Sequence, residues 1–297
     1  MTDPREITTT LELTQRAQAH LEARELDLAI EVVSIVEEKF MDDPIALHLA
    51  GVVWERAFLE FNAMGKSPSL VYYEKAAQYF ERALKLDPEK FPFHAERLYT
   101  CLFVLGTQKN DLNRLKQSQA LAEKLSDSAD ELLAANYQHE LAIIKSGIAR
   151  ITQEIPDWEA ADEAFEKLDC PDSGREKYFF CYYKGIVKRS LAEFHQDQQF
   201  LLEAIAAFRV ALAELRLRSV MFLLADCLLQ LEQPDAIDLS EMQEYIPELI
   251  QKSPEDPVIQ TLFQRWEVRL KLLGLNPKPL TDVTDNSLPP TPEDEQS

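Results

Sequence analysis

The sequence predicts an all-α protein built from stacked antiparallel helix hairpins. Its 297 residues include 7 glycines, and no alternating apolar run is bounded by the Asn-Gly or Asp-Gly turns that are typical of β-hairpins. Ala, Leu, Glu, Lys and Gln, which favour helices, are abundant instead. In many segments apolar residues recur every three or four positions, which is the spacing of one helix face. We therefore expect helices throughout the folded part of the chain.

The clearest motif lies in residues 74–88. Ala76, Phe80, Ala83 and Pro88 stand at spacings of four, three and five. The alanines allow a partner helix to approach, Phe80 fills the space between the helices, and Pro88 ends the helix because it cannot donate the next hydrogen bond. This segment resembles the second helix of a tetratricopeptide repeat. The resemblance implies a right-handed superhelical array, an α-solenoid, of about six hairpins, because one hairpin alone cannot bury its apolar face.

Two hairpins are expected before Pro88. The first has a turn near residues 24–27 and ends at Pro44; its apolar residues are Leu13, Ala17 and Leu21 in one helix and Ala29, Val33 and Val36 in the other. The first helix of the second hairpin pairs with residues 74–88 and carries Leu47, Ala50, Gly51 and Trp54. Residues 57–65 exceed the family pattern, so this helix is expected to be prolonged and to break at Ser67 and Pro68.

The third and fourth hairpins carry a weaker motif. The third is expected to join residues 93–106 to residues 112–125. In the fourth, a long amphipathic helix over residues 130–151 precedes a partner helix over residues 158–168.

The fifth hairpin returns to the family spacing, with Cys181, Lys184, Gly185 and Lys188 in its first helix and Ala204, Phe208 and Ala211 in its second. Residues 191–195 are again in excess. In the sixth hairpin residues 221–228 precede residues 242–249, where Pro247 is expected to bend the helix axis. A last helix from Pro257 to Gly274 is expected to cap the array. The repeat domain thus spans residues 1–274.

Residues 275–297 differ in composition from the rest of the chain. From Asn276 onward Pro, Thr, Asp and Glu dominate, with few large apolar residues after Leu280. We expect a disordered, acidic and proline-rich tail. Its segment 289–292 fits a polyproline ligand and, at Thr291, a proline-directed phosphorylation site, although such short matches often arise by chance.

Charge and hydropathy exclude several functional classes. The formal net charge is −21 and the sequence pI is about 4.7, so phosphate backbones and anionic lipids are repelled, and direct nucleic-acid binding is not expected. Acidity has a simpler explanation too, since exposed carboxylates keep a protein soluble. No stretch approaches the roughly 20 apolar residues that span a bilayer, and the N-terminus lacks a signal peptide. We expect a cytoplasmic protein, with the nucleus as the alternative.

Motifs for catalysis are missing. The histidines show no metal-ligand spacing, and no glycine-rich phosphate loop or nucleophile elbow occurs, so we expect no metal, no cofactor and no enzymatic activity. The widely spaced Cys101, Cys170, Cys181 and Cys227 are expected to be reduced packing residues. The compact basic group of Lys184, Lys188 and Arg189 is expected to form salt bridges with a neighbouring helix, or else to receive an acidic group of a partner.

The resemblance also implies where a partner binds. In this family the first helices of successive hairpins line a concave groove that holds a client segment. The equivalent positions here are His48, Val52, Glu55, Glu96, Thr100, Phe103, Phe179, Tyr182, Ile186, Arg189, Phe222, Asp226 and Leu229. Each of these residues could equally pack between repeats. Together they predict a mixed apolar and acidic trough that suits an extended or helical segment with apolar and basic residues.

A chaperone-tail adaptor is disfavoured by particular residues. Family members that bind the acidic C-termini of Hsp70 and Hsp90 use a carboxylate clamp of Lys and Asn in the first helix and further polar and basic residues in the next ones. Here the equivalent positions hold Thr14, Gln18, Glu96 and Thr100, so the clamp is missing.

Three functional hypotheses follow. The first is a non-enzymatic scaffold or adaptor that binds a partner segment in its groove. The alternative is a dedicated acidic chaperone that shields a basic client, such as a ribosomal or nuclear protein. The two differ in how strongly salt weakens binding. The third is an enzyme on a helical-repeat scaffold, such as the protein prenyltransferase alpha subunits, but their recurring Trp and Arg signatures are not found.

Overall fold

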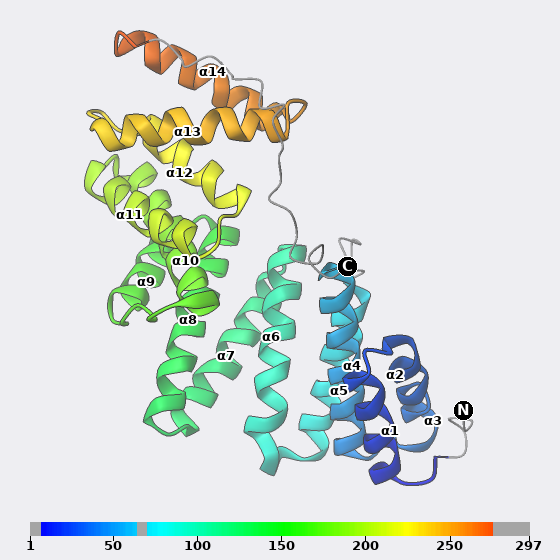
Figure 1. Ribbon diagram of the computed structural model, residues 1–297. Helices are drawn as coiled ribbons and strands as arrows, with labels where there is room; N and C mark the ends of the chain where they lie inside the picture. The colour runs from blue at the N-terminus through cyan, green and yellow to red at the C-terminus, as the bar shows by residue number, and fades with distance from the viewer. Residues whose placement is uncertain (1–6, 64–69, 276–297) are drawn as a thin grey trace, which may run out of the picture. The chain divides into compact units, whose positions relative to one another are not determined.

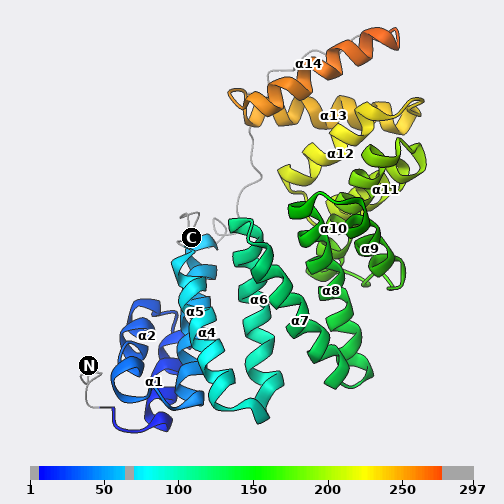
Figure 2. The ribbon, with the colours of Figure 1, turned by 180° about the vertical axis from the view of Figure 1, so that it is seen from behind.

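The computed structural model describes residues 7–63 and 70–275, and all regular secondary structure in these ranges is helical (Figure 1). The prediction of an all-α protein made of helix hairpins is therefore confirmed. Short connections join each helix to the next, and the views from front and back both show neighbouring helices side by side (Figure 2). We call α1, α4, α6, α8, α10, α12 and α14 the first helices, and the helices that follow them the second helices.

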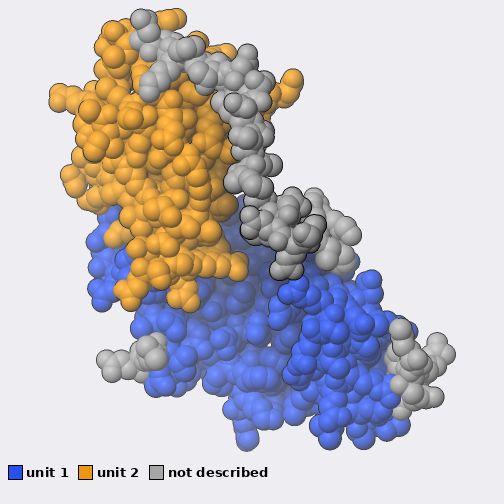
Figure 3. All heavy atoms as spheres, viewed as in Figure 1, with its two compact units in different colours: residues 1–171, 186–195 blue, residues 172–185, 196–297 orange. Residues whose placement is uncertain are grey.

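The chain forms two compact units, which are described separately (Figure 3). Unit 1 contains residues 1–171 and 186–195. Its helices are α1 (Thr10–Glu22), α2 (Leu26–Val33), α3 (Val36–Lys39), α4 (Pro44–Ala63), α5 (Val71–Leu86), α6 (Phe91–Lys109), α7 (Leu112–Ser128), α8 (Glu131–Thr152) and α9 (Ile155–Glu166), with the 3₁₀ turn η2 (Pro88–Lys90) before α6. Within this unit each first helix contacts the next: α1 packs on α4, α4 on α6, and α6 on α8.

Unit 2 contains residues 172–185 and 196–297, so helix α10 (Gly174–His195) contributes residues to both units. Its other helices are α11 (Gln198–Glu214), α12 (Arg218–Gln230), α13 (Ala236–Lys252) and α14 (Pro257–Leu272). Helix α14 packs against both α12 and α13, which agrees with the predicted terminal helix.

A glycine in the first helix makes room for a phenylalanine of the second. A Cβ atom built on Gly51 would lie 2.6 Å from the ring of Phe80, and one built on Gly185 would lie 2.6 Å from the ring of Phe208. Both phenylalanines are fully buried, as are the alanines that flank them in the predicted spacing. The second and fifth hairpins therefore share one packing arrangement, as the sequence motif predicts.

Aspartates define where many helices begin. The side chains of Asp111, Asp130, Asp197, Asp235 and Asp256 accept backbone N–H bonds at the starts of α7, α8, α11, α13 and α14. These carboxylates satisfy amides that have no partner within the helix and lie at the positive end of its dipole. Part of the acidic composition thus serves the fold itself.

Two predicted details of the helices are wrong. The second helix of the first hairpin is not continuous, because α2 ends at Val33 and α3 begins at Val36. Ser34 lies in this break and its hydroxyl donates to the carbonyl of Glu31, at 2.7 Å, in a sequence rich in β-branched residues that favour helices weakly. Pro44 does not end that hairpin but opens α4, a position where its missing N–H is tolerated.

The two insertions in the family pattern extend first helices, as predicted. Helix α4 continues to Ala63, while the expected break at Ser67 and Pro68 lies outside the described residues. Helix α10 continues to His195. Helix α13 includes Pro247 in its interior. The tail from Asn276, with the Thr291 segment, lies outside the described residues.

The glycine–phenylalanine contact can be tested by a double-mutant cycle. We expect Gly51→Ala to destabilise the protein by about 1–2 kcal/mol, because overpacking against Phe80 outweighs the roughly 1 kcal/mol gained from helix propensity. In a Phe80→Leu background the same substitution should be neutral or stabilising. Urea unfolding of the four proteins measures this coupling.

Gly147→Ala provides the matched control. A Cβ atom at Gly147 would lie 3.3 Å from the nearest atom, on the half-buried ring of Phe103, so a small shift of that ring relieves the contact. Equal destabilisation by Gly51→Ala in both backgrounds would show that the Phe80 contact does not set this approach.

Candidate protein-binding faces of the first helices

In unit 1 the first helices α4 and α6 carry six of the residues that the family resemblance selects. Glu96 is exposed, and Val52, Thr100 and Phe103 are half-buried. His48 and Glu55, by contrast, are buried between α4 and α6. We call the surface that carries Val52, Glu96, Thr100 and Phe103 the unit 1 face.

The buried His48 joins α4 to α6. Its Nδ1 atom lies 3.2 Å from Nδ1 of His94, and its ring stacks on Phe93 with the centroids 3.9 Å apart. Burial, followed by the charges of His94 and Arg97, lowers the pKa of His48 to about 4. Burial also lowers the pKa of His94. The pair is therefore neutral near pH 7, so that one Nδ1–H donates to the other Nδ1.

Glu55 forms a second link between the same helices. Arg97 of α6 donates to its carboxylate at 3.1 Å, while burial raises the pKa of Glu55 and the Arg97 charge opposes that rise. The adjacent thiol of Cys101 has a pKa raised by burial. Because its side chain is 7% exposed and bound to Arg97, Glu55 acts in the packing of α4 on α6.

Two glutamates lie beside a pair of tyrosines between α6 and α8. The rings of Tyr99 and Tyr137 meet edge to face, with centroids 6.3 Å apart. Burial raises the pKa of both hydroxyls, and the negative charges of Glu140, beside Tyr99, and Glu96, beside both rings, raise them further. We call Glu96, Tyr99, Tyr137 and Glu140 the acidic tyrosine cluster.

Sequence reasoning selected only Glu96 of this cluster. A signal was present, since Glu96 and Tyr99 stand three positions apart, as do Tyr137 and Glu140, so each pair shares a helix face. What the sequence does not give is the register of α6 against α8 that brings the two pairs together.

The C-terminal part of α10 belongs to unit 1 and holds Ile186, Lys188 and Arg189. The buried ammonium of Lys188 forms ion pairs with Asp162 at 2.8 Å and Glu166 at 2.9 Å, both on α9. The predicted salt bridge to a neighbouring helix is thus confirmed for Lys188. Ile186 and Arg189 are half-buried, and Arg189 pairs with Glu193 of its own helix at 3.2 Å.

In unit 2, α10 carries a row of aromatic side chains. Tyr178 stacks on Tyr182 with centroids 5.8 Å apart, and Phe179 on Tyr183 at 6.4 Å. The guanidinium of Arg175 lies 5.3 Å from the Phe179 ring. The predicted groove residues Phe179 and Tyr182 are half-buried and belong to this row.

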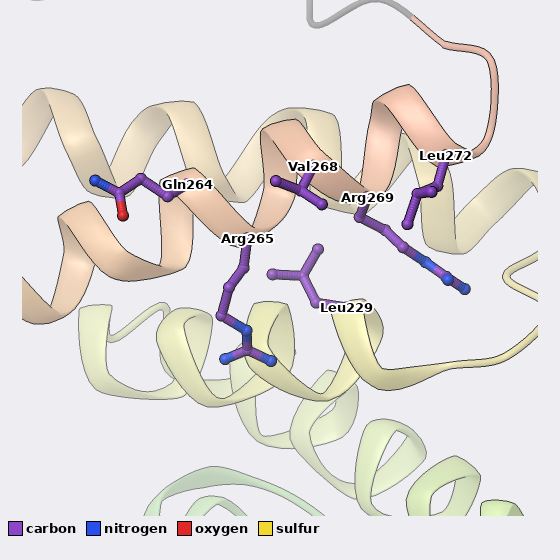
Figure 4. A pocket seen from close by; sticks show the side chains of 6 residues that line it. All are labelled: Leu229, Gln264, Arg265, Val268, Arg269 and Leu272. Carbon is purple, nitrogen blue, oxygen red and sulfur yellow. The ribbon is translucent and has the colours of Figure 1, made fainter.

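Helix α12 places Phe222 half-buried and Asp226 in the interior. Arg265 of α14 donates to the Asp226 carboxylate at 2.5 Å, so Asp226 joins successive first helices as Glu55 does in unit 1. Beside this pair lies a shallow, mainly apolar depression of about 330 Å³, which we call the terminal hollow (Figure 4). It is lined by Leu229, Gln264, Arg265, Val268, Arg269 and Leu272.

The described residues also bear on whether the chain has a metal site, a membrane-spanning helix or exposed cysteines. Within residues 7–63 and 70–275 no group of three or more His, Cys, Asp and Glu side chains is placed to hold a metal ion. No helix in these same ranges is long and apolar enough to cross a membrane. Cys101, Cys181 and Cys227 are buried in helices, whereas Cys170 is exposed after α9.

Comparisons with known proteins gave distant structural likenesses and no sequence relative. No protein-family model and no curated protein sequence matches the chain. Among solved structures, a chain described as the assembly chaperone of RpL4 (Acl4), residues 1–338, is 17% identical, with 91% of this chain and 98% of that chain covered and a TM-score of 0.44. This likeness is too low to transfer a function.

The histidine pair predicts a loss of stability in mild acid. Because the pKa of His48 is about 4 in the folded protein and 6.5 in a free side chain, the unfolded chain binds the proton first as pH falls. The contribution to stability is complete above about pH 6.5 and decreases towards pH 4. Between about pH 7.5 and pH 5 we expect His48 to account for a loss of roughly 2 kcal/mol.

Urea unfolding of the wild type and His48→Leu at both pH values measures this term. The variant should lose less stability on acidification than the wild type, since carboxylate effects are common to both. An equal loss in the two proteins would show that His48 is not held neutral by its surroundings.

Proposed function

We propose that this protein is a non-enzymatic chaperone that binds and shields a basic client protein through the unit 1 face. The proposal depends on the charge of the chain and on one local arrangement, the acidic tyrosine cluster. We propose the chaperone in preference to a general adaptor, and the cytoplasm or the nucleus as its location.

The acidic tyrosine cluster supports recognition of lysine and arginine. Glu96 is exposed and forms no ion pair with any of the described residues, so its carboxylate is available to a cation. Glu140 and the two tyrosine rings lie next to it. Because Tyr99 and Tyr137 are buried, the groups that attract a cation are the exposed carboxylate of Glu96 and the half-buried carboxylate of Glu140. The half-buried Thr100 and Phe103 extend this surface along α6 and suit apolar neighbours of the cation.

The chain has more carboxylates than its own basic side chains can neutralise. Basic side chains such as Arg82, Arg97, Arg209 and Lys188 are already paired with acids inside the structure. With 52 acidic and 31 basic residues, the net charge of −21 stays uncompensated within the chain. A basic client would reduce this self-repulsion on binding, and long-range attraction would accelerate its capture.

The adaptor hypothesis has its own support in the half-buried aromatic residues Phe103, Phe179, Tyr182 and Phe222 of the first helices. Aromatic side chains dominate many protein interfaces, and their contribution responds little to salt. Salt dependence therefore separates the two functions.

Capture from a cell lysate on the immobilised full-length chain tests the chaperone proposal. Mass spectrometry should identify proteins with lysine- and arginine-rich segments, and raising NaCl from about 0.05 to 0.5 M should release them, because screening weakens attraction between exposed charges. For an identified client, Glu96→Lys together with Glu140→Lys should weaken binding at least about tenfold.

Glu123→Lys together with Asp127→Lys is the matched control, since it makes the same charge change on α7, a second helix, at exposed positions. It should weaken binding much less. Clients that lack basic segments and remain bound in high salt would favour the adaptor instead. Equal weakening by both pairs of substitutions would indicate attraction to net charge without a defined face.

A further inference from the structure

Helix α14 has two apolar stripes, of which only one is covered. Ile259, Leu262, Trp266 and Leu270 are buried where α14 packs on α12 and α13. A second stripe consists of Val258, Val268 and Leu272, which are 57%, 57% and 74% exposed. The outer face of a terminal helix in a repeat array is normally polar, so this second stripe is unusual.

Val268 and Leu272 of the second stripe line the terminal hollow. Leu229 of α12 lies between the side chains of Arg265 and Arg269, and Val268 and Leu272 complete the apolar part of the wall (Figure 4). A volume of about 330 Å³ is enough for one or two aliphatic side chains.

Two cations at or next to the hollow, Arg269 and Lys271, form no ion pair with a described carboxylate. Arg269 donates to two main-chain carbonyls, those of Leu231 and Glu232, and forms no ion pair with a described residue. Lys271, which follows Val268 by one turn on the same side of the helix, is exposed and likewise unpaired within the described part of the chain. Arg265 pairs with Asp226 but keeps its side chain 46% exposed. In a chain of net charge −21, this is an unusual place for unmatched positive charge.

The end of α14 has a cap that reverses the direction of the chain. Gly274 adopts a left-handed conformation with φ of 69°, and the N–H of Leu275 donates to the carbonyl of Leu270 at 2.9 Å. This bond closes the last turn as in a Schellman motif, in which the chain reverses at the helix end.

The residues that follow match the hollow in chemistry and reach. Residues 276–297, which lie outside the described part, carry five carboxylates against one lysine. Leu280 and Val283 alternate there with Asp282 and Asp285. Val268 lies about 10 Å back along the helix from Leu275, whereas five extended residues span about 17 Å, so Leu280 can reach it.

We infer that the acidic tail folds back over α14 and occupies the terminal hollow. The side chains of Leu280 and Val283 cover Val268 and Leu272, and Asp282 and Asp285 lie near Lys271 and Arg269. The tail thereby completes the cap of unit 2. A basic client would be repelled by these cations, so the hollow is distinct from the unit 1 face, and the inference does not depend on the proposed function.

Methyl NMR of the full-length chain tests the inference. Replacing Leu280 and Val283 together by Asp should shift the methyl signals of Val268 and Leu272. Thr291→Asp together with Gln296→Asp, which adds the same charge near the end of the tail, should leave them in place. Hydrogen exchange gives a second measurement: amides of residues 280–283 should exchange on the order of tenfold more slowly than in an isolated tail peptide, and Leu272→Asp should abolish this protection.

Unchanged methyl signals in the Leu280 and Val283 variant, or tail amides that exchange as fast as in the peptide, would overturn the inference. Sedimentation identifies the competing occupant, a second copy of the chain. A dimer that dissociates in Leu272→Asp, with no protection of the tail, would assign the hollow to self-association and overturn the inference as well.

Discussion

The close approach of two helices at a glycine is the constraint on which each well-marked hairpin depends. Gly51 and Gly185 have no side chain, so the rings of Phe80 and Phe208 lie directly against the first-helix backbone. A phenylalanine buried in this way contributes about 1.5–3 kcal/mol and also fixes the rotation of both helices. That rotation decides which residues of a first helix face its partner and which face the next repeat. On α4, Gly51 meets Phe80 of α5, while His48 and Glu55 on the same part of the helix contact His94 and Arg97 of α6.

Much of the fold could be predicted because its signals are local. Residue spacing placed Gly51 and Phe80, and likewise Gly185 and Phe208, at family positions on the two helices of one hairpin. The insertions after Trp54 and Lys188 were correctly assigned to longer first helices. The break at Ser34 was missed because it depends on a balance between β-branched residues and a side-chain hydrogen bond that periodicity does not register. The candidate site was harder to predict. Its acidic tyrosine cluster joins residues of different hairpins, and the burial of Glu55 and Asp226 depends on arginines more than 35 residues later in the sequence.

An Arg–carboxylate contact between successive first helices occurs in both units and shows that some of the acidic residues are required by the fold. Arg97 on Glu55 in unit 1 and Arg265 on Asp226 in unit 2 each place an exposed arginine over a buried carboxylate of the preceding first helix. Breaking such a pair leaves a buried charge without compensation, so these acids are constrained by stability. Aspartate caps are constrained in a similar way. Asp162 and Glu166, which pair with the buried Lys188, are also held by the fold. Glu96 belongs to none of these groups, so its charge is not explained by a contact in the described structure.

Sign of charge also separates the two candidate binding surfaces. The acidic tyrosine cluster of unit 1 carries negative charge, whereas the terminal hollow of unit 2 combines apolar walls with Arg265 and Arg269. A single ligand chemistry does not suit both. The net charge of −21 repels any separate acidic molecule. A free acidic partner would therefore meet repulsion each time it approached the hollow. A covalently attached tail avoids this problem, because its effective concentration near α14 is set by a linker of only a few residues. Intramolecular attachment is therefore the property that would let the inferred tail contact form within an acidic protein.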